Sequence, residues 1–163
     1  MRLAAIALLL IALSAPCVAQ TEPPAAYIAG AGIGFCRTAA PQTTGGLIFG
    51  ARPANQENAW LVLQYDNITG ETSTVMVNGM QYLSWRGNWG LFAIAGAGSA
   101  TKDGALMGAF SGGGGMSLKL RAFSGKLDGL IVSGAVKALK ITGPDPEINQ
   151  ARLQFNFFLT KSF

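Results

Sequence analysis

Apolar and polar residues alternate with a period of two along most of the chain, which is the pattern of β-strands with two different faces. In the segment 151–163, most large apolar side chains fall on one face: Leu153, Phe155, Phe157, Leu159 and Phe163. Phe158 and Lys161 break this alternation. A similar long segment covers 105–121, although four consecutive glycines interrupt its middle. The alternation predicts a protein built mainly from strands.

Clusters of Gly, Pro, Asn, Asp and Ser separate the alternating segments and mark turns. The predicted strands cover residues 26–37, 46–52, 59–66, 72–81, 88–98, 105–121, 127–141 and 151–163. An even number of strands brings both termini to the same end, and eight strands make the smallest closed bacterial membrane barrel. We therefore predict an all-β fold, an eight-stranded antiparallel up-and-down transmembrane β-barrel.

The N-terminal segment has a different pattern. Met1-Arg2 is a basic start, Leu3 to Leu13 is an uninterrupted apolar run, and Ser14 to Ala19 is rich in small residues. These are the three parts of a cleavable secretory signal. Pro16 interrupts the run before it reaches the roughly 20 apolar residues that a spanning helix needs. We predict a signal peptide at 1–19, a short lead-in at 20–25 and a barrel domain at 26–163.

The amino-acid composition is unusual for a soluble domain. Half of the residues are apolar and 12% are charged, whereas about 25% is usual for soluble domains. No stretch after the signal offers 18 apolar residues without a charge, so any membrane span has to be made of strands. Without Arg2 the 12 basic residues become 11, against 8 acidic ones. This small, scattered excess does not indicate nucleic-acid binding.

The residue types needed for common catalytic chemistry are missing. The sequence contains no histidine, which removes the usual general base of nucleophilic catalysis and a frequent metal ligand. Asp145 and Glu147 share one predicted loop, but two carboxylates fall short of the six to eight ligands of calcium. Cys36, the lone cysteine after the signal, is interpreted as an apolar filler. We predict no enzymatic activity, catalytic residue, cofactor or metal site.

The parity of each strand predicts which side chains face lipid and which face the interior. Predicted to face lipid are Leu61, Leu63, Tyr65, Val75, Val77, Leu118, Leu120, Leu130 and Val132. Predicted to form an interior charge cluster of structural importance are Lys119, Arg121, Asp128 and Lys137. Aromatic residues near strand ends are expected in girdles at the two membrane interfaces; these are Tyr27, Phe35, Trp60, Tyr65, Tyr82, Trp85, Trp89 and Phe163.

The C-terminal segment ends in a phenylalanine that follows alternating apolar residues. In this the chain resembles the small OmpA-like outer-membrane barrels of Gram-negative bacteria. The resemblance implies that barrel-insertion machinery recognises a signal made of Phe155, Phe157, Leu159 and Phe163. It also implies that outer-membrane lipid surrounds the protein. The motif covers only 151–163, and the low charge count departs from the charged interiors common in that family.

These features predict a non-enzymatic outer-membrane barrel with a structural or surface-contact role in the envelope. It would be porin-like in architecture but without a wide pore, because side chains fill an eight-stranded barrel. The alternative is a soluble periplasmic or secreted β-barrel that binds a small apolar ligand. A membrane barrel carries its large apolar side chains on the outside, and a soluble carrier carries them inside.

Overall fold

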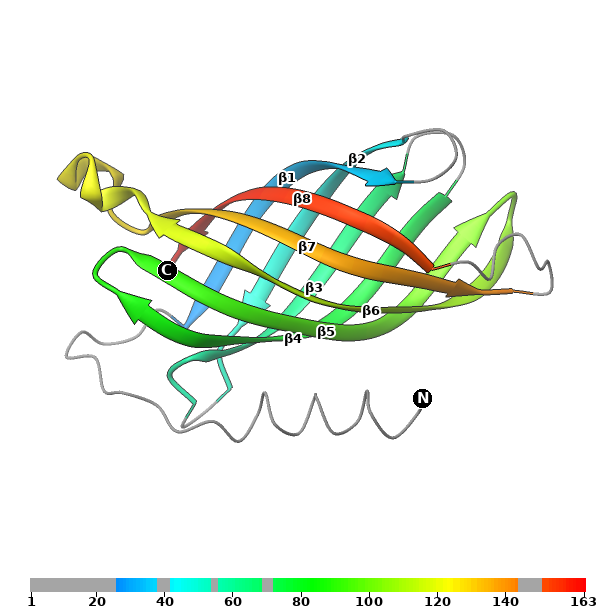
Figure 1. Cartoon of the computed structure of the whole chain (residues 1–163), viewed down its shortest axis with the longest axis horizontal. Coiled ribbons are helices and arrows are strands. Elements are labelled where there is room, and N and C mark those ends of the chain that lie inside the picture. The colour runs from blue at the N-terminus through cyan, green and yellow to red at the C-terminus, as the bar shows by residue number, and fades with distance from the viewer. Residues whose placement is uncertain (1–25, 38–41, 54–55, 69–71, 144–150) are drawn as a thin grey trace.

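Eight antiparallel strands form a closed barrel in the computed structural model (Figure 1). The structure describes residues 26–37, 42–53, 56–68, 72–143 and 151–163. The strands are β1 (Tyr27–Arg37), β2 (Gln42–Ala51), β3 (Ala59–Ile68), β4 (Thr72–Arg86), β5 (Trp89–Lys102), β6 (Ala105–Lys119), β7 (Leu130–Thr142) and β8 (Ala151–Ser162). Each strand pairs with the next along the chain, and β1 pairs with β8. The predicted all-β fold, an eight-stranded antiparallel up-and-down barrel, is confirmed.

Hydrogen bonds between the first and last described residues continue the β1–β8 ladder to its end. The backbone N–H of Ala26 donates to the Phe163 carbonyl at 2.9 Å, and the Phe163 N–H donates to the Tyr27 carbonyl at 2.9 Å. Within the ladder, Ile28 faces Ser162 and Arg37 faces Leu153. This closure leaves no free sheet edge, because every strand pairs with a neighbour on both sides.

The barrel has two distinct ends (Figure 1). The terminal end carries Ala26 and Phe163, together with two short 3-10 helices, η1 (Leu120–Ala122) and η2 (Gly125–Leu127). The distal end carries the tight β5–β6 turn, where Asp103 and Gly104 have φ of 50° and 80°. Two positive φ values in a two-residue loop match the twist of the strands. No helix in the described ranges is long and apolar enough to cross a membrane.

The predicted strand limits fail at the β6–β7 connection. Leu120 lies in η1 and Asp128 directly follows η2, so neither residue is on a strand as predicted. The Ser124 hydroxyl accepts a hydrogen bond from the Lys126 N–H at 3.3 Å. Gly129 adopts a φ of 76°, a conformation that glycine tolerates best. Because of this local turn chemistry, β6 ends earlier and β7 begins later than the apolar pattern predicts. The predicted signal peptide and lead-in lie outside the described residues.

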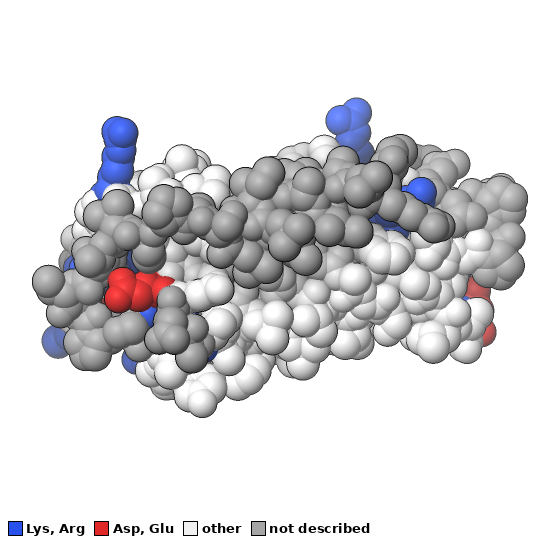
Figure 2. All heavy atoms as spheres, turned by 90° about the horizontal axis from the view of Figure 1, so that it is seen from below, with Lys and Arg blue, Asp and Glu red and all other residues white. Residues whose placement is uncertain are grey.

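Large apolar side chains cover the outside of the barrel. The exposed ones on β3 and β4 are Leu61, Leu63, Tyr65, Val75, Val77 and Leu83. Those on the other strands include Ile33, Leu47, Phe49, Leu91, Phe110, Met116, Val132, Val136, Phe157 and Leu159. Figure 2 shows uncharged residues over the middle of one face, with Lys, Arg, Asp and Glu toward the ends. The barrel thus has an apolar outer belt between charged ends.

Three aromatic residues that were expected in the outer girdles, Trp60, Tyr82 and Trp85, face the interior instead. Trp60 and Tyr82 are 6% and 7% exposed and belong to a buried apolar cluster, against which Trp85 also packs. An irregularity in the β4–β5 register between Tyr82 and Ser84 changes the parity of β4, which turns Trp85 inward. Tyr27, Phe35, Tyr65, Trp89 and Phe163 lie on the outside, as expected.

Candidate functional site inside the barrel

The barrel interior is divided into three layers along its axis. The inward side chains of β3 show the order: Trp60 and Val62 are in an apolar layer near the terminal end, Gln64 and Asp66 in a polar layer, and Ile68 in a distal apolar layer. The terminal layer also contains Ile28, Ile48, Met80, Tyr82, Phe92, Ile94, Ala135 and Phe158. The distal layer also contains Cys36, Met76, Ala100, Met107, Ala109, Leu139 and Ile141.

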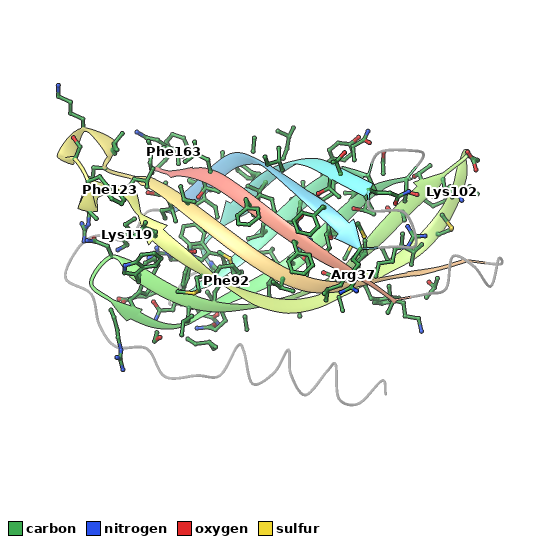
Figure 3. All side chains as sticks on the ribbon, turned by 45° about the horizontal axis from the view of Figure 1, so that its top comes forward. Arg37, Phe92, Lys102, Lys119, Phe123 and Phe163 are labelled. Carbon is green, nitrogen blue, oxygen red and sulfur yellow. The ribbon has the colours of Figure 1, made fainter. Side chains whose placement is uncertain are left out.

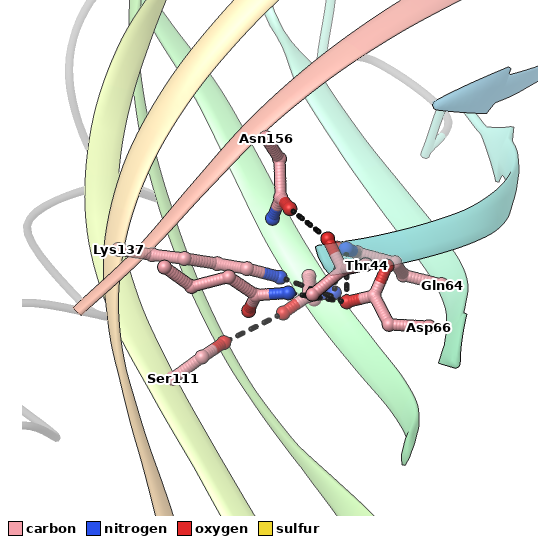
Figure 4. A network of polar contacts seen from close by, with 8 residues as sticks. Thr44, Gln64, Asp66, Ser111, Lys137 and Asn156 are labelled. Carbon is pink, nitrogen blue, oxygen red and sulfur yellow. Dashed lines mark hydrogen bonds and ion pairs between the residues drawn. The ribbon is translucent and has the colours of Figure 1, made fainter. Parts of the chain in front are cut away.

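A buried ion pair forms the centre of the polar layer (Figure 4). The Lys137 ammonium on β7 lies 3.5 Å from the Asp66 carboxylate on β3, and the two side chains are 2% and 3% exposed. Gln64 and Gln154 donate side-chain hydrogen bonds to the same carboxylate oxygen at 2.7 and 3.2 Å. The charge of Asp66 is therefore balanced by one cation, and two amides donate hydrogen bonds to it in a buried site.

Further hydrogen bonds extend the polar layer across the barrel. The Asn78 amide donates to the Gln64 amide oxygen at 3.3 Å, and the Ser111 hydroxyl donates to the Asn78 amide oxygen at 3.1 Å. On the other side, the Thr44 hydroxyl donates to the Asn156 amide oxygen at 3.3 Å. The layer joins side chains from β2, β3, β4, β6, β7 and β8. These contacts fasten opposite walls of the barrel together.

The predicted interior charge cluster is wrong as a single group. Lys137 lies in the polar layer with Asp66, whereas Lys119, Arg121 and Asp128 lie at the terminal end. Strand parity assigned all four residues to the inner face. Lys137, however, lies seven residues after the start of β7 at Leu130, which is roughly 23 Å along the strand at about 3.3 Å per residue. Asp66, the partner that sequence analysis missed, shares parity with Gln64 opposite the outward Leu61, Leu63 and Tyr65. This alternation in the sequence indicates that Asp66 faces the interior.

A cavity of about 380 Å³ lies in the terminal apolar layer. Buried side chains such as Met80, Phe92 and Phe158 line it, and so do the exposed Glu57 and Asp128, so the cavity opens at the terminal end. On its wall, the Tyr82 hydroxyl lies 2.9 Å from the Ser117 hydroxyl, which lies 2.8 Å from that of Ser133. The cavity is therefore mainly apolar inside and polar at its mouth.

Two cations stand over aromatic rings at the cavity mouth. The Arg52 guanidinium lies 4.8 Å from the centre of the Trp60 ring, and the Lys119 ammonium lies 4.6 Å from that of Trp85. These are cation–π distances. Figure 3 shows Lys119 at the end of the barrel near Phe163 and Phe123, with Phe92 further inside. The rings hold the basic groups beside the entrance.

Glycines on β1 make room for large side chains of β8. Gly30, Gly32 and Gly34 share the inward parity of Ile28 and Cys36. A side chain at Gly32 would collide with the ring of Phe158, and one at Gly34 with Asn156 and Thr44. Phe158 breaks the β8 alternation because it turns inward into the space above Gly32.

The residues predicted to face lipid are mostly on the outer surface. Leu61, Leu63, Tyr65, Val75, Val77 and Val132 are exposed, and Leu118 is half-buried on the same parity. Leu130 is half-buried at the start of β7 and lines the cavity at the terminal end. Leu120 also departs from the prediction, because it lies in η1. Of the residues in the predicted insertion signal, Phe157, Leu159 and Phe163 are exposed, and Phe155 is half-buried against Phe35 at 4.7 Å between ring centres.

The polar residues of the described ranges do not form a recognisable metal centre: these ranges contain no group of three or more Cys, Asp or Glu able to hold a metal ion. Asp145 and Glu147 lie outside the described residues. Cys36 is completely buried in the distal apolar layer, as the filler interpretation expects.

Comparison with known proteins supports the fold. No protein-family model and no curated protein sequence matches the chain. Among solved structures, it is similar to a chain from the de novo design of transmembrane β-barrels, with a TM-score of 0.54 and 12% sequence identity. The match covers 88% of this chain and all of the designed one. The chain shares the architecture of a transmembrane β-barrel. At this identity the similarity concerns the fold alone.

Proposed function

We propose that this protein is a non-enzymatic β-barrel of a bacterial outer membrane, with a structural or surface-contact role in the cell envelope. The arrangement of its two faces carries the proposal. Large apolar side chains cover the outer belt, while an ion pair and several amides are buried inside. Soluble proteins place charged groups on the surface, whereas membrane barrels combine an apolar outside with a polar interior. A closed ladder also satisfies the backbone within lipid.

The interior argues against a conducting role. Side chains that line an open channel are accessible to water, but Gln64, Asn78 and Gln154 in the polar layer are 0–1% exposed. The polar layer therefore acts as a plug between the two ends. This agrees with the expectation that eight strands enclose a space that side chains fill.

The C-terminal strand supports the finer part of the proposal. Phe155, Phe157 and Leu159 alternate along the outward parity of β8, and Phe163 is exposed at its end. An ending of this kind in OmpA-like barrels serves as an insertion signal. We propose that barrel-insertion machinery and outer-membrane lipid are the partners of this segment. The absence of histidine from the sequence supports a non-enzymatic role.

Cell fractionation followed by gel electrophoresis with and without boiling tests the proposal. We expect the protein in the outer-membrane fraction, with a faster-moving folded band before boiling and a slower band afterwards. A soluble periplasmic protein processed in parallel is the control. Recovery in the soluble periplasmic fraction without heat-dependent mobility would contradict the proposal and favour the soluble carrier. In planar bilayers, the purified barrel should give no stable open channel.

A further inference from the structure

We propose that the cavity at the terminal end binds a single-chain amphiphile with an anionic head, such as a medium-length carboxylate. The chain would occupy the apolar interior, and the head would lie among the basic groups of the rim. This binding site goes beyond the envelope role proposed above. Its test also gives a separate readout, because ligand binding is measured independently of cellular location.

The size of the cavity fits one alkyl chain. Its volume of about 380 Å³ lies near the lower limit of small-molecule sites, which span roughly 300–1,000 Å³. Along β8 the lining extends from Ser162 to Phe158, which is four residue steps, or about 14 Å at roughly 3.4 Å per residue. A space of this volume and length suits one extended chain better than a two-chain lipid.

The cavity wall provides apolar contacts and a closed base. Met80, Phe92 and Phe158 are each 4–7% exposed, and below them Val62 is completely buried. The polar layer begins at Gln64, the next inward residue of β3. An alkyl tail that enters from the mouth would therefore meet mainly apolar groups, apart from the hydroxyls of Tyr82 and Ser133 on the wall, and would stop above the polar layer. Burial of this tail would provide the main driving force.

The charges of the rim favour an anion. Four basic residues line the cavity, Arg52, Lys119, Arg121 and Lys161, against two acidic ones, Glu57 and Asp128. Arg52 and Lys119 are half-buried, and their positions over Trp60 and Trp85 hold them near the entrance. A carboxylate at this level can accept charge-assisted hydrogen bonds from such groups. A cationic head would be repelled by these groups, and a neutral head would lack the attraction between opposite charges.

Quenching of tryptophan fluorescence tests the proposal with the full-length mature barrel in phosphatidylcholine vesicles. The background variant is Trp89→Phe, because Trp89 lies on the outer face and would report quencher dissolved in the bilayer. The remaining Trp60 and Trp85 line the cavity. The probe is a terminally brominated decanoate, and the comparison ligand is the matching brominated decanol. We expect saturable quenching, with the carboxylate bound at least tenfold more tightly than the alcohol.

Three variants locate the site. Combined Lys119→Gln and Arg121→Gln substitutions should weaken carboxylate binding about tenfold or more, since both charge-assisted contacts are removed. Ala135→Phe should abolish saturable quenching because the added ring occupies the cavity. Lys126→Gln is the matched control, because Lys126 is an exposed cation at the same end that does not line the cavity. It should bind like the background variant.

Several outcomes would overturn the proposal. Quenching that rises linearly without saturation would show only partition into the bilayer. Equal affinity for the carboxylate and the alcohol, or an unchanged affinity in the Lys119 and Arg121 double variant, would show that the basic residues of the rim do not bind the head group. Persistence of saturable binding in a folded Ala135→Phe variant, judged by its unboiled gel mobility, would place the ligand elsewhere.

Discussion

The polar layer and the terminal cavity lie inside the same eight-stranded barrel, yet one is filled and the other is hollow. In the polar layer, amides, an ammonium and a carboxylate converge on one another, and Asp66 alone receives three polar contacts. In the cavity, the apolar side chains leave about 380 Å³ unfilled, and the basic groups stand at the rim. The number of strands therefore limits the width of the barrel interior, and the inward side chains at each level determine whether that level is filled or hollow.

The largest expected effect comes from breaking the ion pair of the polar layer. Lys137→Ala removes the cation from Asp66 and leaves a carboxylate buried at 3% exposure. Loss of one partner of a buried pair costs about 3–5 kcal/mol, so the free energy of unfolding should fall by that amount. Urea unfolding of the barrel from vesicles, followed by gel mobility, measures it.

Two controls show whether the loss arises from the unpaired charge. Lys140→Ala removes an exposed lysine from the same strand and should change the stability by less than about 0.5 kcal/mol. The double variant Asp66→Asn with Lys137→Met removes both charges but keeps an amide oxygen for the Gln64 and Gln154 donors, and should recover most of the loss. If Lys137→Ala were as stable as Lys140→Ala, the polar layer would not hold the walls together.

An alanine-to-phenylalanine substitution should have different effects in the filled distal layer and in the hollow terminal layer. Ala109→Phe in the distal layer, where Ala109 is completely buried, should destabilise the barrel by about 1–3 kcal/mol through overpacking. Ala135→Phe faces the cavity and should cost less than about 1 kcal/mol, because space is available there. Urea unfolding of both variants gives the comparison. Equal losses would indicate that the cavity is not hollow in the folded barrel.

A smaller effect is expected from the hydroxyl chain on the cavity wall. Tyr82→Phe removes the hydroxyl that lies 2.9 Å from Ser117 but keeps the ring. The net value of one such hydrogen bond is about 1 kcal/mol, and the folded barrel should lose roughly that much stability. Tyr65→Phe is the control, because the Tyr65 hydroxyl is on the outside at 3.4 Å from Ser73. A Tyr82→Phe variant no less stable than this control would contradict the prediction.

The strands could be predicted from sequence because one face of each is apolar and the chain alternates with a period of two. The outward parity of Leu63 and Val77 follows directly from that rule. The Asp66–Lys137 pair could not be predicted, because it joins β3 and β7 across the barrel and depends on the height that register gives each residue. Strand parity determines which face of the sheet a side chain is on, but not its level along the barrel axis. For this reason the prediction wrongly grouped Lys137 with Asp128.

The cavity was also beyond sequence analysis. It depends on which inward side chains meet at one height, and the inward turn of Trp85 follows a register irregularity in β4 that the apolar pattern does not reveal. Phe158 looked like a defect in the alternation of β8, but its place is explained only by the glycine that faces it on β1. Such complementarity between neighbouring strands requires the three-dimensional pairing.

The central claim, that the apolar outer belt lies in lipid hydrocarbon, is tested most directly by placing arginine at two depths. Leu63 is in the middle of β3 and Leu106 is near the end of β6, and both are exposed on the outside. In a bilayer, Leu63→Arg should cost about 2–4 kcal/mol of unfolding free energy and Leu106→Arg about 0–1 kcal/mol. The same small loss in both variants, measured by urea unfolding from vesicles, would mean that water surrounds the belt and would contradict the claim.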